Sequence, residues 1–160
     1  MAQVSWMWGG KRYYGTLIRE TKTHKFARTK NGKIKNKLHK NEQIILDGAH
    51  AETDAKNLAN YLRDIKVPKY AVWAMMKNKE PDLFIKQFKG IFRKIITMPI
   101  ENEKNCISAK DLTSIGKKNK FNIDKADNFN EAIMKITSKD KKLIVCIGSL
   151  YNVGNILNKN

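Results

Sequence analysis

The chain has 160 residues and a mass of 18.5 kDa, enough for one domain with a sizeable core. Its 41% hydrophobic residues exclude a disordered chain, and no apolar run approaches the roughly 18 residues that a membrane span requires. Residues 1–14 lack the pattern of a signal peptide. Cys106 and Cys146 lack metal-ligand spacing, so we expect reduced thiols and a cytoplasmic location.

The formal charge is +17, from 32 Lys and Arg residues against 15 Asp and Glu residues. Such an excess is typical of proteins that bind nucleic acid or an anionic membrane surface. Lys predominates, however, and Lys is the weaker side chain for bidentate binding of bases or phosphates. We therefore favour a solvated basic surface, and keep a nucleic-acid-binding module that uses residues 11–40 as the alternative. The five arginines are Arg12, Arg19, Arg28, Arg63 and Arg93.

From Gln43 onward, short apolar runs alternate with amphipathic patterns that have the period of a helix. Ala55, Leu58, Ala59 and Leu62, for example, fall on one helical face. The expected strands are 43–46, 70–75, 92–98, 121–123 and 143–147, and the expected helices are 52–63, 81–90, 108–115, 129–136 and 150–157, with a polar break at 116–120.

Strands that alternate with helices of this length predict right-handed crossovers and a mainly parallel sheet of the α/β class, covered by helices on both faces. Such a sheet carries its functional loops at the carboxyl ends of its strands. The loops expected at that edge are 47–51, 77–82, 99–108 and 148–151.

The first 40 residues follow a different pattern. Asn31-Gly32 is a strong hairpin signal, so residues 25–37 are expected to form an antiparallel edge. Residues 1–14 contain several aromatic residues without a regular period, and the sequence assigns them no fold.

Catalytic signatures are mostly missing from the sequence. Gly9-Gly10-Lys11-Arg12 echoes part of a phosphate-binding loop but lacks the hydroxyl residue that would hold Mg²⁺. The three histidines show no metal-like pairing, and no Ser-His-Asp order stands out. We therefore expect no metal site and no complete active site within this chain.

One segment is more informative about function than the rest of the sequence. Residues 44–50, Ile-Ile-Leu-Asp-Gly-Ala-His, run directly into the expected helix 52–63. Asp47 at the end of a strand can accept ribose hydroxyls or a metal-bound water, Gly48 allows a ligand to approach the backbone, and His50 lies near a helix N-terminus that favours anions. In the alternative interpretation Asp47 merely caps the helix and His50 is an ordinary surface residue.

Residues 47–50 resemble the Asp-Gly-Ala-His-Asn-Pro motif of folylpolyglutamate synthase and the bifunctional dihydrofolate synthase, which belong to the Mur ligase superfamily. Three further stretches agree in order and spacing. Residues 26–29 resemble a degraded Trp-Pro-Gly-Arg-Thr segment, residues 74–80 resemble the loop "MMKDKD", and residues 147–154 resemble the terminal segment "GSLYLVG". The resemblance covers roughly residues 17–158.

The resemblance implies the C-terminal domain of a three-part ligase. Its fold would be a Rossmann-like mixed sheet with one antiparallel strand, which would place a hairpin of residues 30–37 at the sheet edge. Family members use ATP with Mg²⁺ to activate a folate carboxylate as an acyl phosphate, which the amine of L-glutamate then attacks. Their ATPase domain, with its P-loop and its metal ligands, lies N-terminal to the part that resembles this chain.

The resemblance also implies roles for individual residues. Arg28 and Asp47 would contact ATP, His50 and Ser149 would line the cleft where glutamate meets the acyl phosphate, and Gly48 and Gly148 would support the loops.

Two departures from the family pattern bear on these roles. Ala51-Glu52 replaces Asn-Pro and adds a negative charge beside the expected site, and Lys25-Phe26-Ala27 replaces Trp-Pro-Gly before the arginine. The expected division is an unassigned segment 1–24 and a ligase-type domain 25–160 that is inactive alone. Two alternatives follow: a separate chain carries the ATPase domain and is the partner, or the chain is a genetic remnant without one. A membrane or nucleic acid is not an expected partner.

Overall fold

The structure is a computed structural model that describes residues 3–8, 11–20, 25–29 and 42–158, with side chains from residue 42 onward. The strands are β1 (Gln3–Trp8), β2 (Lys11–Glu20), β3 (Lys25–Thr29), β4 (Glu42–Leu46), β5 (Lys69–Trp73), β6 (Lys94–Thr97), β7 (Ile123–Lys125) and β8 (Lys142–Ile147). The helices are α1 (Glu52–Arg63), α2 (Pro81–Lys86), α3 (Ala109–Lys118), α4 (Phe129–Met134) and α5 (Leu150–Asn158).

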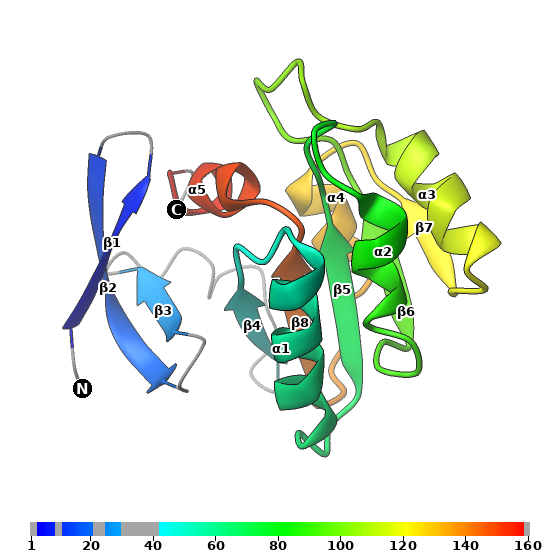
Figure 1. Ribbon diagram of the computed structural model, residues 1–160. Coiled ribbons are helices and arrows are strands. Elements are labelled where there is room, and N and C mark those ends of the chain that lie inside the picture. Colours follow the sequence, from blue (N-terminus) through cyan, green and yellow to red (C-terminus); the bar gives the residue numbers. More distant parts are fainter. Residues whose placement is uncertain (1–2, 9–10, 21–24, 30–41, 159–160) are drawn as a thin grey trace.

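The described strands form two sheets. The larger sheet has the order β4-β8-β5-β6-β7, and every neighbouring pair in it is parallel. The smaller sheet has the order β1-β2-β3 and is antiparallel. The smaller sheet lies beside α5 and β4 (Figure 1).

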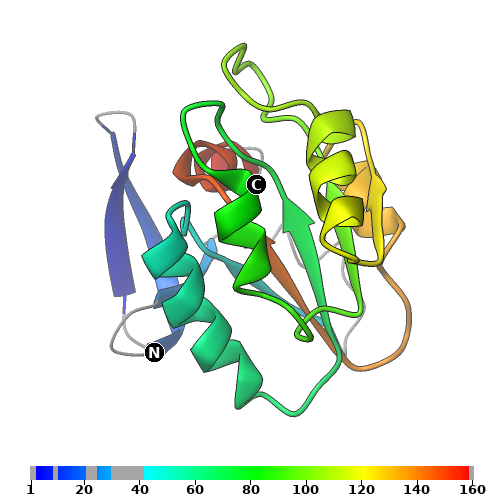
Figure 2. The same ribbon diagram turned by 45° about the vertical axis from the view of Figure 1, so that its right-hand side comes forward.

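Helices cover both faces of the larger sheet, as the sequence predicts. Along β8, Leu143, Val145 and Ile147 pack on the side of α1, α2 and α3, whereas Ile144 and Cys146 pack on the side of α4 and α5. This alternation follows from the two-residue period of a strand. Figure 2 shows α1 and α2 side by side in front of the sheet. The expected α/β class with a parallel sheet is therefore confirmed.

Strand β5 and helix α2 end earlier than predicted, although apolar residues continue beyond the end of each. Ala74 and Met75 are fully buried although β5 ends at Trp73. Helix α2 ends at Lys86 rather than near residue 90, because the following residues form tighter turns such as Ile91 N–H to Phe88 O at 3.0 Å. A buried apolar run therefore marks the core more reliably than it marks the ends of an element.

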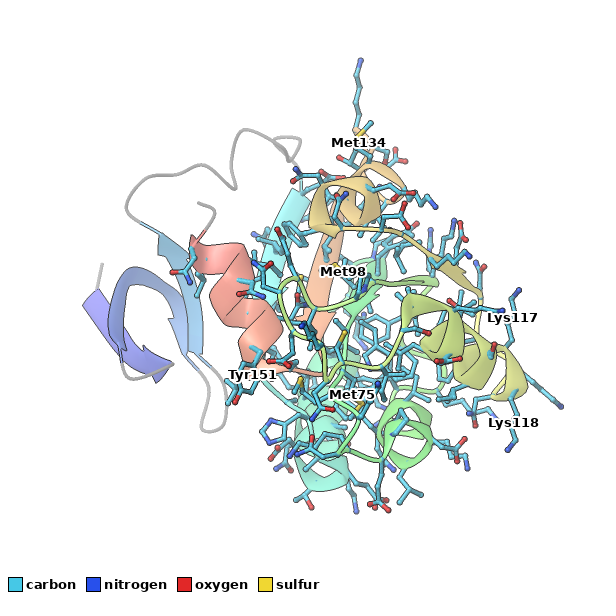
Figure 3. The ribbon with its side chains drawn as sticks, turned by 90° about the horizontal axis from the view of Figure 1, so that it is seen from above. Met75, Met98, Lys117, Lys118, Met134 and Tyr151 are labelled. Carbon is cyan, nitrogen blue, oxygen red and sulfur yellow. The ribbon has the colours of Figure 1, made fainter. Side chains whose placement is uncertain are left out.

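The predicted break at 116–120 begins later than expected, because α3 continues through Gly116 and ends at Lys118. Gly116 is buried, and a Cβ atom placed there would come within 2.4 Å of Ile123 Cδ1. The glycine thus allows α3 to approach β7 closely rather than ending the helix. Lys117 and Lys118 then point away from the body at the end of α3 (Figure 3), where positive charge complements the helix dipole.

The antiparallel part of the fold was only partly predicted. Residues 25–29 are indeed an antiparallel edge strand, but β3 pairs with β2. The expected hairpin residues 30–37 lie outside the described residues, and none of the described strands in the larger sheet is antiparallel. Within segment 1–14, to which the sequence assigned no fold, residues 3–8 form β1 and residues 11–14 belong to β2. The proposed domain boundary at 24/25 stays a prediction.

A buried ion pair joins the amino ends of β4 and β8. Lys142 Nζ lies 3.7 Å from Glu42 Oε1, and the two side chains are 4% and 0% exposed. Glu42 also accepts hydrogen bonds from Thr137 Oγ1 at 2.7 Å and Ser138 N–H at 2.8 Å, while Lys142 donates to Ile136 O at 2.9 Å. These hydrogen bonds compensate for the desolvation of both charges.

We expect Lys142→Met to lower the free energy of unfolding by about 3–5 kcal/mol, because it leaves the Glu42 carboxylate buried without its cation. Urea denaturation measures this difference. Lys141→Met, at an exposed neighbouring position, is the matched control and should have little effect. Adding Glu42→Gln to Lys142→Met should recover part of the loss; equal stability of the two lysine variants would contradict the expectation.

Candidate functional site

The candidate site lies at the carboxyl edge of the larger sheet, where the four predicted loops come together. Figure 3 looks down on this edge, with Met75 and Met98, which follow β5 and β6, near its centre. Because all five strands of this sheet are parallel, segments far apart in the sequence end at one edge.

Hydrogen bonds join these loops in pairs. Gly148 N–H donates to Ala49 O at 2.9 Å, which joins loop 148–151 to loop 47–51. Lys77 N–H donates to Asn105 O at 2.9 Å, which ties the second loop to the third. The edge is therefore held by backbone contacts that do not depend on the identity of most loop side chains.

The Asp47 carboxylate is held in place by its own loop. Asp47 is 9% exposed, and its Oδ1 atom accepts a hydrogen bond from Ala49 N–H at 2.7 Å. Helix α1 begins after Ala51 without a side-chain cap, so the interpretation of Asp47 as a helix cap is wrong. The carboxylate is instead a pre-oriented acceptor at the end of β4.

His50 is oriented by the same loop. Its Nδ1 atom lies 2.8 Å from Gly48 O, and the ring is partly buried. Because a carbonyl oxygen can only accept, Nδ1 carries the proton, and Nε2 is the ring atom left for other partners. The ring therefore has a specific orientation, which argues against the alternative interpretation of His50 as an ordinary surface residue.

Ser149 begins α5. Its hydroxyl oxygen accepts hydrogen bonds from Tyr151 N–H at 3.1 Å and Asn152 N–H at 3.4 Å, and the residue is 3% exposed. Such a serine stabilises a helix N-terminus. The hydroxyl proton remains as a donor, so the capping role and the predicted role in the cleft are compatible.

The two predicted support glycines are closely packed, Gly148 against the backbone of Ala74 and Gly48 against the flexible side chain of Leu150. A Cβ atom on Gly48 would lie 2.1 Å from Leu150 Cδ2, and one on Gly148 would lie 2.3 Å from Ala74 O. Gly148 also has a φ of +102°, which side-chain-bearing residues rarely adopt. Both glycines therefore allow loop 47–51, loop 148–151 and the end of β5 to pack closely.

Arg28 is the remaining predicted site residue. Its backbone lies in β3 and pairs with Thr16, and β3 lies beside β4. The Arg28 side chain lies outside the part of the chain that the structure describes. Its expected contact with ATP stays a prediction.

The structure adds two polar residues at this edge that sequence reasoning missed. Trp73 Nε1 is buried against Gly148 without a hydrogen-bond partner, and both side-chain polar atoms of Asn152 are also buried without one. Trp73 looked like an ordinary core residue of a strand. Asn152 could have been noticed, because it interrupts the apolar stripe of the last helix.

Other expectations about reactive groups can be compared with the described residues. Cys106 and Cys146 are both free, and burial raises the pKa of the Cys146 thiol far above its ordinary value. Among residues 42–158 and the described earlier strands, no group of three His, Cys, Asp or Glu residues could hold a metal ion. No helix within these ranges is long and apolar enough to cross a membrane.

Comparison with known families places most of the chain in one of them. The family model described as the C-terminal domain of dihydrofolate synthetase matches residues 30–159. A comparison with curated protein sequences finds no match.

Solved structures of similar fold cover the same part. Folylpolyglutamate synthase of Mycobacterium tuberculosis, complexed with ADP and AMPPCP, is 17% identical with a TM-score of 0.63; the match covers 72% of this chain and 29% of that one. FolC of E. coli in complex with DHPP and ADP is 18% identical with a TM-score of 0.63, covering 72% and 28%. Folylpolyglutamate synthase of Thermotoga maritima is 22% identical with a TM-score of 0.62, covering 76% and 28%. The chain thus spans less than a third of these relatives.

We expect Gly148→Ala to lower the free energy of unfolding by about 2–5 kcal/mol, because the added methyl group meets Ala74 O in a strained backbone conformation. Gly90→Ala is the matched control. Gly90 also has a positive φ, +77°, but no atom lies within 4 Å of the position that an added methyl group would take, so only the backbone cost of about 1–2 kcal/mol applies. Thermal or urea denaturation measures both, and equal losses would contradict the packing argument.

Proposed function

The chain belongs to the dihydrofolate synthetase C-terminal domain family, and from that premise we propose that it acts as the closing domain of an ATP-dependent ligase. The reaction would add L-glutamate to a folate through an acyl phosphate. The single observation that carries the proposal is the carboxyl edge itself: Asp47 and His50 are both oriented by their own loop, on the edge where parallel sheets bind ligands.

Asp47 suits the ribose of ATP better than its phosphates. A pre-oriented carboxylate accepts hydrogen bonds from hydroxyl groups, whereas the nearby first turn of α1 contains Glu52 and Asp54, which repel phosphate. Glu52 Oε1 also accepts from Gln87 Nε2 at 3.2 Å, which keeps its charge near α2. The triphosphate would then require cations from elsewhere, and Arg28 is the candidate within this chain.

His50 and Ser149 would face glutamate. The Nε2 atom of His50 and the hydroxyl proton of Ser149 are the polar groups that the local hydrogen bonds leave over. Nε2 of His50 at this place can take a proton from the glutamate ammonium group, which frees the amine to attack the acyl phosphate, and Ser149 can donate to a carboxylate of the substrate. Mg²⁺ would supply charge neutralisation on ATP, held by residues of an ATPase domain.

An ATPase domain is the proposed partner, either on a separate chain or on a larger one. Leu150 and Tyr151 are each 50% exposed beside the candidate site, and exposed apolar side chains at a site edge suit an interface. The solved relatives are more than three times as long as the part that they share with this chain, and the 160 residues contain no P-loop. We therefore propose that residues 1–160 alone do not ligate glutamate. We also propose that the reaction occurs in the cytoplasm.

The alternative function, a nucleic-acid-binding module, uses residues 11–40. The side chains of these residues lie outside the described part of the chain. No geometric observation favours this function over the ligase domain, so it stays a prediction.

The function can be tested by complementation. Purified chain, the ATPase domain of a related folylpolyglutamate synthase, ATP, Mg²⁺ and a folate are mixed, and incorporation of labelled glutamate is measured. We expect no incorporation with the chain alone and measurable incorporation with both parts. Ligation by the chain alone would refute the proposed dependence on an ATPase domain.

In the active mixture, Asp47→Asn should raise the KM for ATP about tenfold or more, because an amide is a weaker acceptor for ribose hydroxyls than a carboxylate. Asp64→Asn, which removes the same charge from an exposed position at the far end of α1, is the control. An unchanged KM for ATP in the Asp47 variant would contradict the assigned role.

A further inference from the structure

The charge of the chain is divided unequally between the two edges of the larger sheet. Because its strands are parallel, helices α1 to α4 each return the chain to the amino edge, where β5, β6, β7 and β8 begin. The segments at this edge are residues 64–69, 87–94, 117–122 and 135–142, which we call the basic edge. They contain eleven Lys and one Arg, but only two acidic residues, Asp64 and Asp140.

The carboxyl edge, which carries the candidate site, has the opposite balance. Loops 47–51, 77–82, 99–108 and 148–151 together contain three Lys against five Asp and Glu residues. In Figure 2 the turn after α1 and the orange turn before β8 lie at the lower end of the sheet, and loop 99–108 lies at the upper end. The positive charge of this part of the chain is therefore concentrated on the edge remote from the candidate site.

Some cations of the basic edge have anionic partners. Lys94 Nζ and Lys135 Nζ lie 4.0 and 3.8 Å from Asp124 Oδ2 in β7, and Lys142 is paired with Glu42. Seven further exposed side chains make no ion pair or hydrogen bond within the described part of the chain: Lys66, Lys89, Arg93, Lys117, Lys118, Lys120 and Lys141. Figure 3 shows Lys117 and Lys118 pointing away from the body. The basic edge thus keeps most of its charge available to a partner.

Nothing else in the sequence can neutralise this edge. Residues 1–41 contain eleven Lys and Arg residues, and Glu20 is their only acidic residue. Repulsion within the edge is evident at Lys69, whose pKa is lowered by burial and also by the charge of Lys66. An anionic partner would relieve this repulsion.

The available cations follow the sheet edge in a row. The strands are ordered β8-β5-β6-β7, and neighbouring strands lie about 4.8 Å apart, so the row is about 15 Å long. At least one available cation lies just before each of these strands: Lys141, Lys66, Arg93 and Lys120. A nucleic-acid duplex carries one negative charge per roughly 1.7 Å of its axis, so about nine charges face a row of this length. The row therefore suits a linear polyanion.

The aromatic residues of the basic edge do not suit single-stranded nucleic acid. Proteins that bind single strands stack the bases on exposed aromatic rings. At this edge Tyr70, Phe92 and Phe121 are partly buried and packed against the core. Contacts to phosphates alone are those that a duplex offers.

The exposed apolar residues do not suit a membrane. Stable attachment to an anionic membrane takes an apolar anchor in addition to a polybasic patch. Among the described residues, the exposed large hydrophobic side chains of Leu83, Leu150 and Tyr151 lie at the starts of α2 and α5, on the side of the candidate site. Met134, at the end of α4, is the one such side chain beside the basic edge.

We propose that the basic edge binds the phosphate backbone of double-stranded nucleic acid without preference for base sequence. Lysine ammonium groups contact phosphates as point charges and read bases poorly, so affinity without sequence preference is the expected outcome. This surface differs from residues 11–40, on which the alternative function depends. It also requires neither Asp47 nor an ATPase domain, so it stands or falls separately from the ligase proposal.

Fluorescence anisotropy of the full 160-residue chain with a labelled DNA duplex of about 20 base pairs tests the proposal. We expect a dissociation constant on the order of 1–10 μM at about 50 mM salt. With about four phosphate contacts, affinity should fall by roughly a hundredfold or more between about 50 and 200 mM salt. A duplex of scrambled sequence should bind equally well.

Two double variants locate the binding surface. Lys118→Gln with Lys141→Gln removes two cations from the basic edge and should weaken duplex binding about tenfold or more, with a salt dependence shallower by about two contacts. Lys104→Gln with Lys110→Gln removes the same charge from exposed positions outside the basic edge and should weaken binding less than about threefold. Thermal midpoints within about 2 °C of the unchanged chain would show that both variants are folded.

Three outcomes would overturn the proposal. One is the absence of duplex binding at low salt with protein on the order of 0.1 mM. Another is an equal effect of the two double variants, which would assign binding to net charge or to residues 11–40. The third is tighter binding of a single strand, or of vesicles that contain phosphatidylserine, with the same dependence on Lys118 and Lys141. A loss of duplex binding confined to the basic-edge variant would support the proposal.

Discussion

The insertion of β8 between β4 and β5 is the constraint on which the rest of the structure depends. All six residues of β8 are buried, and the strand pairs in parallel with a neighbour on each side. Because β8 is the last strand of the chain, the loop that carries Gly148 reaches the loop that carries Asp47 only after this strand is in place. The candidate site is thus a consequence of sheet order, not of proximity in the sequence.

The same insertion explains where buried charge is tolerated. At the amino ends of β4 and β8, the Glu42–Lys142 pair satisfies its hydrogen bonds with backbone and hydroxyl groups of the preceding turn. This pair is fully engaged and has no capacity left for a ligand. At the opposite, carboxyl edge Trp73 Nε1 and the amide atoms of Asn152 are buried without a hydrogen-bond partner. The two ends of one strand therefore serve stability and binding separately.

Sequence patterns predicted the parallel sheet because its signals are local: strands with buried residues on both faces and helices with one apolar stripe. They failed where the deciding contact is distant. Gly116 looked like a break, but Ile123 across the α3–β7 contact requires it within the helix. The antiparallel pairing of β1 with β2 was not predicted, although the dipeptide Gly9-Gly10, which favours hairpins, separates strands whose pairing extends to Trp8 and Lys11.

The residues of the candidate site were proposed from motifs, but their hydrogen bonds could not be. The motif at 47–50 indicated Asp47 and His50, yet only the structure shows that Ala49 N–H occupies one carboxylate oxygen and that Gly48 O fixes the protonated nitrogen of His50. Ser149 likewise matches a motif while its oxygen already caps α5. A polar side chain can offer a ligand only the hydrogen bonds that it does not already make within the fold. By that measure Asn152, which matches no motif residue, has more hydrogen-bonding capacity left than Ser149 three positions before it.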